Sequence, residues 1–204
     1  MLTPSARASL EGAARQYESH LAAALPYLSG RGITEQTARQ YRLGYVERPV
    51  RGDDEMVGRL AIPYLTTSGV VDIRYRSIDT NEGPKYLSRS GSKARLFSVT
   101  SLLAKAQRIF LTEGEIDCMT LNQIGLPAVG FPGANAWQSH WRLMFSDYDE
   151  VTVICDGDQA GRDFGKKLAE RLDGVIVVHL PDGTDVNDLF VREGEDALRE
   201  RITK

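Results

Sequence analysis

Three short clusters of acidic residues each follow an apolar run of the kind that forms a buried strand. The first begins at Glu113, the second is Asp156-Gly157-Asp158, and the third covers residues 182–188. Few basic residues lie near these clusters in the sequence, so salt bridges do not account for all of them. Carboxylate oxygens are the ligands that Mg²⁺ and Mn²⁺ prefer, and such ions usually also bind substrate phosphates. The pattern therefore predicts a divalent metal site that acts on a phosphorylated substrate.

A structural interpretation of the second cluster stays open beside this one. Asp156 or Asp158 can accept hydrogen bonds from the backbone of the helix that follows, and so act as an N-cap without any metal. Such a cap accounts well for one cluster, but it accounts poorly for all three together.

The elements that must position these acids alternate between strands and helices. Apolar runs lie at 109–111, 128–130, 151–155 and 175–178, and helical stretches lie near 115–124, 136–146 and 159–172. Short buried strands that alternate with helices are typical of a parallel sheet with helices packed on its faces. The carboxyl ends of such strands share one edge of the sheet, where ligands bind. We therefore expect an α/β fold in which the acidic clusters meet at that edge.

The first half of the chain has a different pattern. Helical spacing of apolar residues predicts a helix over about 5–25 and a shorter one over 35–41. A polar loop is predicted over 47–58. Two β-rich runs, 59–65 and 70–76, flank a short turn that contains glycine, and this pattern predicts a hairpin. The first half is therefore expected to be a mixed α+β structure.

The two predicted domains carry opposite charge. A smaller α+β subdomain over 1–106 holds 15 Lys and Arg against 10 Asp and Glu, whereas the α/β domain over 107–204, which ends in a short helical segment, holds 10 against 18. No acid occurs from 83 to 112, where the bases are Lys85, Arg89, Lys93, Arg95, Lys105 and Arg108. A basic half joined to an acidic half suggests a polyanion held near a metal site. Two solvated surfaces of different sign are the simpler alternative.

Length and composition exclude several classes of protein. The 204 residues suffice for one substantial core, or for one domain with a small companion. No apolar run approaches the roughly 18 to 20 residues that cross a bilayer, and the first residues lack the pattern of a secretion signal. Cys118 and Cys155 are too few for a disulfide framework or a four-cysteine zinc site. We therefore expect a cytosolic protein that binds neither zinc nor a membrane.

Several motifs are similar to those of one protein family. Residues 111–117 (LTEGEID) and 156–161 (DGDQAG) resemble the TOPRIM fold that primases, topoisomerases and some nucleases share. The more specific resemblance is to bacterial DnaG-type primases and their phage relatives. It rests on motifs at 27–32 (YLSGRG), 43–45 (LGY), 84–87 (PKYL) and 180–185 (LPDGTD), and it covers about residues 10 to 200.

The resemblance implies the catalytic core of a DNA primase, with a Rossmann-like TOPRIM domain preceded by a basic α+β subdomain. Such an enzyme joins a 3′-hydroxyl to the α-phosphate of an NTP, and so makes short RNA primers on single-stranded DNA. By the same resemblance, Glu113, Asp156 and Asp158 are catalytic acids that bind two or more Mg²⁺ or Mn²⁺ ions. Asp117 and Asp185 are then supporting metal-binding acids of the same cleft.

The resemblance also assigns roles in the basic subdomain. Lys85, as part of the catalytic site, and Arg76 are expected to face nucleotide phosphates or template. Phosphates of single-stranded DNA can be contacted, independently of base sequence, by Lys85, Arg89, Lys93 and Arg95. A solvated basic loop is the alternative for these four. Tyr86 either stacks on a base or packs in the core of the subdomain.

Two features depart from the family pattern. Where many relatives have two acids around a proline, this chain has Asp185-Val186-Asn187 followed by Asp188, so the last acidic ligand stays open between the latter two. The family's zinc-binding module and helicase-interacting region do not fit within the chain. The partners implied are single-stranded DNA, NTPs, a replicative helicase and a zinc-binding primase module on another chain, in the cytoplasm of a bacterial or phage-infected cell.

Two other functions stay open. A small TOPRIM nuclease uses similar acids, although it would not need the basic motif at 84–87. A non-catalytic nucleic-acid-binding module predicts loss of the acids, whereas Glu113, Asp156 and Asp158 are all present. A topoisomerase is excluded because its nucleophilic tyrosine lies on a separate large domain that 204 residues cannot hold.

Overall fold

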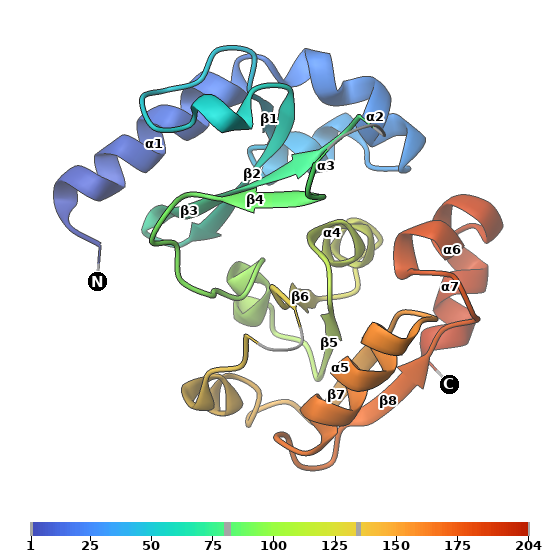
Figure 1. Cartoon of the computed structure of the whole chain (residues 1–204). Helices are drawn as coiled ribbons and strands as arrows, with labels where there is room; N and C mark the ends of the chain where they lie inside the picture. The colour runs from blue at the N-terminus through green and yellow to red at the C-terminus, as the bar shows by residue number, and fades with distance from the viewer. Residues whose placement is uncertain (1, 80–82, 134–135, 204) are drawn as a thin grey trace. The chain divides into compact units, whose positions relative to one another are not determined.

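The computed structural model describes residues 2–79, 83–133 and 136–203, and the chain divides into two compact units (Figure 1). Unit 1 covers Met1–Lys93 and unit 2 covers Ala94–Lys204. The domain limit predicted from the sequence lies later, at 106/107. Leu96 lies in the core of unit 2, and Phe97 exchanges backbone hydrogen bonds of 2.8 and 3.1 Å with Gly130. These contacts place Leu96 and Phe97 in unit 2, although the sequence analysis assigned both residues to the first domain.

Unit 1 combines short helices with an antiparallel sheet. The sheet has the strand order β1-β2-β3-β4, and β2 and β3 form the hairpin predicted from the sequence. The elements in chain order are α1 (Pro4–Glu18), η1 (Leu21–Ala24), α2 (Leu25–Gly30), α3 (Glu35–Gln40), β1 (Gly44–Tyr45), η2 (Asp54–Met56), β2 (Arg59–Thr66), β3 (Gly69–Ser77) and β4 (Tyr86–Ser88).

Helix α1 packs on this sheet through apolar residues at helical spacing. Leu10 and Tyr17, two turns apart, share one core with Ile73 and Tyr75 of β3. The rings of Tyr17 and Tyr75 meet edge to face, with centroids 6.1 Å apart. A Cβ atom at Gly44 would lie 2.3 Å from the backbone of Tyr17, so β1 approaches α1 at a place where only glycine fits.

Unit 2 is an α/β structure around a parallel sheet, as predicted. The sheet has the strand order β6-β5-β7-β8, and each neighbouring pair is parallel. The elements in chain order are η3 (Val99–Leu103), β5 (Arg108–Thr112), α4 (Glu115–Gln123), β6 (Ala128–Gly130), η4 (Ser139–Met144), β7 (Glu150–Cys155), α5 (Gln159–Ala169), β8 (Ile176–His179), α6 (Val186–Glu193) and α7 (Glu195–Ile202).

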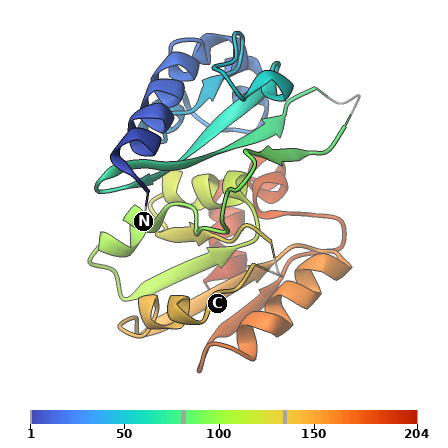
Figure 2. The same cartoon turned by 60° about the vertical axis from the view of Figure 1, so that its left-hand side comes forward.

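Helices cover both faces of the unit 2 sheet (Figure 2). The chain steps from β5 to β6 in one direction and from β7 to β8 in the other, so right-handed crossovers place α4 and α5 on opposite faces. On the α5 face, the rings of Trp141 and Phe164 pack edge to face against the ring of Phe131, with ring centroids 5.5 and 5.6 Å from that of Phe131. This arrangement leaves the carboxyl edge of the sheet between the two layers of helices.

The helix predicted near 136–146 is wrong in type and length. That range contains η4, a short 3₁₀ helix over Ser139–Met144. Trp141 and Phe145, four residues apart, both pack in the aromatic core, whereas Leu143 between them is 76% exposed. Because these two buried rings lie only four residues apart, one tight turn satisfies their burial, and 3₁₀ geometry is used in such short pieces.

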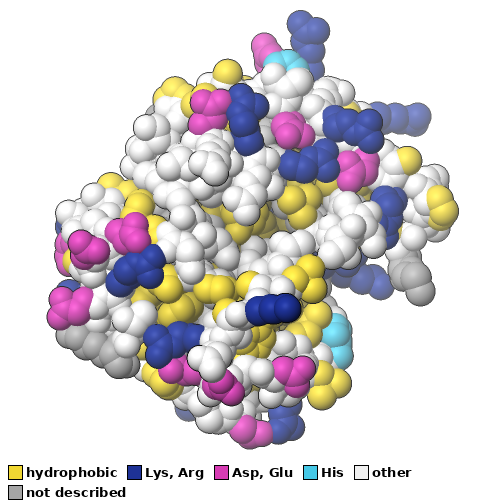
Figure 3. Space-filling view, turned by 180° about the vertical axis from the view of Figure 1, so that it is seen from behind, with side chains coloured by type: hydrophobic (Ala, Val, Ile, Leu, Met, Phe, Trp, Pro, Cys, Tyr) yellow, Lys and Arg dark blue, Asp and Glu magenta, His cyan; other side chains and the backbone are white. Residues whose placement is uncertain are grey.

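Charged side chains of both signs are spread over the molecular face in Figure 3, with hydrophobic side chains between them. The uneven distribution of charge along the sequence does not produce a surface of a single sign on this face. Within the described parts of the chain, no helix has both the length and the apolar character that crossing a bilayer requires.

Candidate active site

Glu113 and Asp156 lie at the same edge of the unit 2 sheet. Strands β5 and β7 are parallel neighbours that end at Thr112 and Cys155, directly before these two acids. Asp117 stands in the first turn of α4, where a Cβ atom at Gly114 would lie 2.6 Å from Oδ2 of this aspartate. The glycine therefore leaves room for the Asp117 carboxylate beside the turn that follows Glu113.

Backbone contacts join the second acidic cluster to the third. The N–H of Gly157 donates to the carbonyl of Thr184, and the N–H of Gly183 donates to the carbonyl of Gly157, each at 2.8 Å. A Cβ atom at Gly157 would lie 1.8 Å from the carbonyl oxygen of Pro181. Any other residue at position 157 would therefore force the loop to move. The loop that carries Asp185 is thereby tied to the turn between Asp156 and Asp158.

Asp158 and Asp185 each cap the helix that follows. Oδ1 of Asp158 accepts from the N–H of Gly161 at 2.7 Å, and Oδ1 of Asp185 accepts from the N–H of Asp188 at 2.6 Å. The N-cap interpretation of the second cluster therefore describes Asp158 correctly. It does not exclude a metal role, because a carboxylate has a second oxygen and several lone pairs.

Asn187 fastens α6 to α4 beside these acids. It is 1% exposed, its backbone N–H donates to Oδ1 of Asp117 at 3.0 Å, and its side-chain amide donates to Oγ1 of Thr120 at 2.9 Å. The Asn187 amide thus holds a helix contact, and its backbone orients the Asp117 carboxylate. Asp188, the other residue left open at this motif, is half-buried and follows in the first turn of α6.

The electrostatics show that five carboxylates gather here. Burial raises the pKa of Asp156 to about 8, and repulsion by nearby carboxylates adds to this shift. The repelling groups are, in order of effect, Asp117, Asp185, Glu113 and Asp158. The structure therefore brings the other four acids that the sequence analysis selected within electrostatic range of Asp156.

The donor set fits a divalent cation in its chemistry. Carboxylate oxygens are hard ligands, and a cation would relieve the mutual repulsion at Asp156. As the side chains stand, however, no three His, Cys, Asp or Glu residues in the described ranges are arranged to hold a metal ion. The acids are thus near enough to repel one another, without converging on one point.

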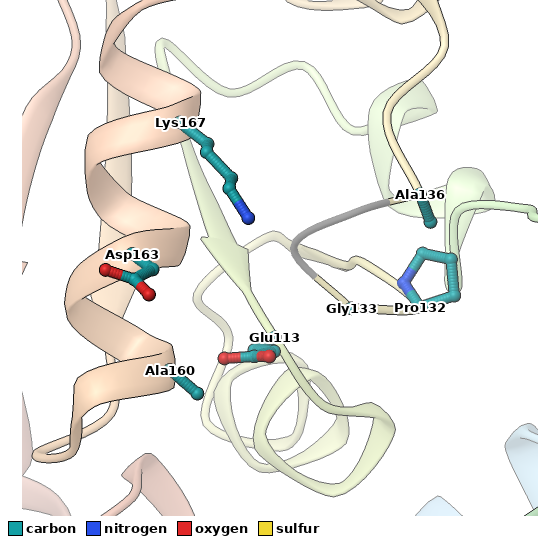
Figure 4. A pocket seen from close by; sticks show the side chains of 7 residues that line it. All are labelled: Glu113, Pro132, Gly133, Ala136, Ala160, Asp163 and Lys167. Carbon is teal, nitrogen blue, oxygen red and sulfur yellow. The ribbon is translucent and has the colours of Figure 1, made fainter.

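A pocket of about 560 Å³ opens beside Glu113, on the α5 face of the sheet (Figure 4). It is lined by Glu113, Pro132, Gly133, Ala136, Ala160, Asp163 and Lys167. The sequence analysis missed Asp163 and Lys167. Their signal was present, because Ala160, Asp163 and Lys167 recur at three- and four-residue spacing directly after the second acidic cluster.

In unit 1, Arg76 and Tyr86 belong to one stack of cations and rings. Arg76 is 6% exposed and its guanidinium lies 5.2 Å from the ring centroid of Tyr86 and 5.9 Å from that of Tyr27. It also donates a hydrogen bond to the Tyr86 hydroxyl. The guanidinium of Arg74 lies over the Tyr86 ring at 4.2 Å. Tyr86 is therefore half-buried, with cations packed against its ring.

Arg89 is engaged inside unit 1. Its guanidinium donates to both oxygens of Asp53, at 2.6 and 2.5 Å, and the same carboxylate accepts from the hydroxyls of Tyr17 and Tyr75, each at 2.6 Å. Asp53 is 1% exposed. The sequence analysis did not select Asp53, which lies in a loop whose polar residues gave no sign of burial. The template contact predicted for Arg89 stays a prediction, and it would have to use donors that do not face Asp53.

The other bases that the sequence analysis selected differ in exposure. Lys85 and Lys93 in unit 1 are exposed, and Arg95 in unit 2 is half-buried. Lys85 extends to 6.0 Å from the centroid of the Tyr86 ring. Lys85 and Lys93 are therefore accessible to a phosphate in solution.

Comparison of the sequence with known proteins gives consistent relatives. A family described as Toprim-like matches residues 110–190. The gene 57 protein of Mycobacterium phage D29 is 41% identical over 150 residues, which cover 71% of this chain and 98% of that protein. A DNA primase of Thermotoga maritima is 31% identical over 219 residues, which cover 86% of this chain and 38% of that protein. The chain thus spans well under half the length of this DNA primase.

Solved structures agree with the sequence comparison. A DNA primase domain from Pseudomonas aeruginosa superposes with a TM-score of 0.80 at 27% identity, covering 97% of this chain and 78% of that one. The DnaG primase catalytic domain bound to single-stranded DNA gives 0.78 at 23% identity, covering 95% and 79%. The zinc-binding and RNA polymerase domains of the Aquifex aeolicus primase give 0.77 at 25% identity, covering 96% and 59%.

Proposed function

This chain belongs to the family of DnaG-type primases with a TOPRIM domain, and we propose on that premise that it is a primase catalytic core. The reaction proposed is the joining of a 3′-hydroxyl to the α-phosphate of an NTP, which makes short RNA primers on single-stranded DNA. The observation that supports it most is the gathering of five carboxylates at the carboxyl edge of the unit 2 sheet. Acids in this number, with a raised pKa at Asp156, are typical of a site that acts on phosphates through divalent cations.

In this proposal Glu113, Asp156 and Asp158 hold two or more Mg²⁺ or Mn²⁺ ions, and Asp117 and Asp185 support them. When bound, such ions lower the pKa of an attacking hydroxyl and stabilise charge on the phosphoryl oxygens. The chain's own contribution is to hold the acids in place. The caps at Asp158 and Asp185 fix one oxygen of each carboxylate, and the Asn187 backbone fixes one oxygen of Asp117.

The basic subdomain is proposed to bind template and nucleotide phosphates. Exposure supports Lys85 and Lys93 as contacts, and Arg95 joins them in the proposal. Arg76 and Tyr86 support this surface from within. Their stacking and hydrogen bond hold the start of β4 in position, directly after Lys85. Binding of this kind depends on charge and falls steeply with salt. We keep the division into domains at 1–106 and 107–204 as part of the proposal.

Two of the proposed partners have parallels among the relatives. One solved relative is bound to single-stranded DNA, and another comprises zinc-binding and RNA polymerase domains of a primase. We propose that this chain acts on single-stranded DNA and NTPs, with a zinc-binding primase module and a replicative helicase on other chains. The site of action is the cytoplasm of a bacterial or phage-infected cell.

One assay separates this function from a TOPRIM nuclease. Purified chain is incubated with single-stranded DNA, labelled NTPs and Mn²⁺ or Mg²⁺, with and without a zinc-binding primase module, and the products are sized. A primase lengthens ribonucleotides and leaves the template uncut, and Glu113→Gln removes the product without unfolding the chain. DNA cleavage that depends on Glu113, with no RNA product in either condition, would show a nuclease instead.

A further inference from the structure

Helix α5 presents one polar face and one buried face. Ala160, Asp163 and Lys167 line the pocket beside Glu113, whereas Phe164 and Leu168 lie in the core of unit 2. This division follows from helical spacing, since residues three and four apart share a face. The pocket-lining face of α5 is therefore set by the same packing that buries its other side.

Close packing fixes the position of this helix. A Cβ atom at Gly161 would lie 2.2 Å from the carbonyl oxygen of Asp156, and one at Gly165 would lie 2.4 Å from Sγ of Cys155. Both glycines thus let α5 approach the end of β7 more closely than any other residue would. Lys167 is consequently carried by a rigid element that is anchored next to Asp156.

Lys167 points from α5 into the pocket, on the side that faces Glu113 (Figure 4). Its side chain is half-buried, and it shares the pocket lining with the carboxylates of Glu113 and Asp163. The remaining lining is small, namely Pro132, Gly133, Ala136 and Ala160. The pocket volume of about 560 Å³ lies within the range of small-molecule sites.

A lysine at this place can serve either of two purposes. It can neutralise the carboxylates beside it, in which case it competes with a divalent cation for them. Alternatively, it can bind an anion that arrives together with the cation. The second purpose suits a pocket that is open enough for a ligand, because an ion pair with Glu113 or Asp163 would need no such space.

We propose that Lys167 binds a phosphate group of the ligand that reacts at Glu113. The inference rests on the proposed function, since it assigns a further phosphate contact to the same site. The phosphate can come from the triphosphate of an incoming nucleotide or from the phosphodiester backbone of a bound strand. Both sources present the same anionic oxygens to the ammonium group.

Two probes distinguish the sources without requiring catalysis. The first is α,β-methylene ATP with Mn²⁺, in which the bond that nucleotidyl transfer breaks cannot be cleaved. The second is a fluorescent single-stranded oligodeoxythymidylate with Mn²⁺, measured by anisotropy. The variants are Lys167→Ala and Lys167→Arg, and the control is Lys166→Ala, which removes the same charge from an exposed neighbouring position.

We expect Lys167→Ala to lower the affinity for one of the two probes by roughly tenfold, which is the effect of losing a hydrogen bond to a charged group. Lys167→Arg should recover most of that affinity, and Lys166→Ala should leave both affinities within about twofold of wild type. A loss confined to the ATP analogue assigns the triphosphate, and a loss confined to the oligonucleotide assigns the strand. Unchanged melting temperatures show that the variants are folded.

The inference is overturned if Lys167→Ala is folded and binds both probes as wild type does. It is also overturned if this variant binds Mn²⁺ more tightly while keeping its affinity for both probes, because Lys167 then only neutralises the acids. If wild-type protein makes RNA in the primer assay and Lys167→Ala makes as much RNA, this inference alone is rejected. If wild-type protein binds neither probe and makes no RNA, the proposed function is rejected with it.

Discussion

The backbone N–H of Asn187 donates a hydrogen bond of 3.0 Å to the Asp117 carboxylate. This bond joins the first turn of α6 to the first turn of α4, at the edge of the sheet where the acids gather. By its resemblance to DnaG-type primases, the sequence led us to expect an acid at the position of Asn187. In this chain an uncharged side chain therefore occupies a buried place beside Asp117 and donates to Thr120.

We expect Asn187→Asp to lower the free energy of unfolding by about 1–3 kcal/mol in metal-free buffer. An ionised carboxylate cannot donate to Oγ1 of Thr120, which already donates to the carbonyl of Ile116 at 2.9 Å, and it adds repulsion beside Asp117. Urea denaturation with EDTA measures the loss. Asn187→Ala separates the lost hydrogen bond from the added charge, and added Mg²⁺ should raise the stability of the Asp variant more than that of the Ala variant, because the cation also offsets the added charge. Equal stability of Asn187→Asp and wild type in EDTA would contradict this account.

Asp156→Asn is expected to abolish or strongly weaken Mn²⁺ binding and to leave stability in metal-free buffer level or higher. The reason is that four nearby carboxylates repel the Asp156 charge, and the amide removes that repulsion at almost unchanged volume. Isothermal titration measures the binding, and thermal melting in EDTA measures the stability. Asp149→Asn serves as a control, because Asp149 is exposed and precedes β7 at its opposite end. Undiminished Mn²⁺ binding, or a large loss of stability, would favour a purely structural role for this acid.

The Asp53 network predicts an acid-sensitive stability. Burial raises the pKa of this carboxyl, but hydrogen bonds from Arg89, Tyr17 and Tyr75 outweigh that effect and hold the pKa below its usual value. Because the folded pKa is depressed, the stabilisation is present above the unfolded value of about 3.9 and is lost as the pH falls through the folded value. Denaturant titrations of wild type at a series of pH values below about 5 should show this loss.

Asp53→Asn should remove that part of the acid dependence and lower stability at pH 7 by about 3–5 kcal/mol, since it leaves the Arg89 charge without its anion. Asp54→Asn is the matched control, because Asp54 is the exposed neighbour of the buried residue. If the two variants behave alike, the network does not stabilise unit 1.

Lys85 and Arg76 should respond differently to alanine. Lys85 is exposed, so Lys85→Ala is expected to keep the fold, weaken binding of single-stranded DNA several-fold and reduce the salt slope by about 1. Arg76 is buried against Tyr27 and Tyr86, so Arg76→Ala is expected to lower the melting temperature. Anisotropy at several salt concentrations and thermal melting separate the two effects. Lys105→Ala controls for loss of an exposed charge elsewhere. Salt-independent binding, or binding unaffected by Lys85→Ala, would argue against a phosphate contact at this lysine.

The sequence by itself determined the order of the strands along unit 2 and the places where acids follow them. The apolar run at 151–155 became β7, and the run at 175–178 overlaps β8. Such signals are local, because burial of a strand or of one helix face depends on the spacing of neighbouring residues. Once the sheet is parallel, Glu113 and Asp156 must share an edge, whatever the remaining contacts are.

Only the tertiary structure decided which polar groups pair. Arg89 meets Asp53 across 36 positions of sequence, and Asn187 meets Asp117 across 70. Neither pair has a periodic signal, and Arg89 is indistinguishable in sequence from a solvated base. The physical reason is that burial of a charge is tolerated only where another segment supplies its partner, and that segment is chosen by the packing of the whole unit. Residue type and spacing therefore predicted the chemistry of the acids, whereas the folded chain decided which side chains are engaged in holding them.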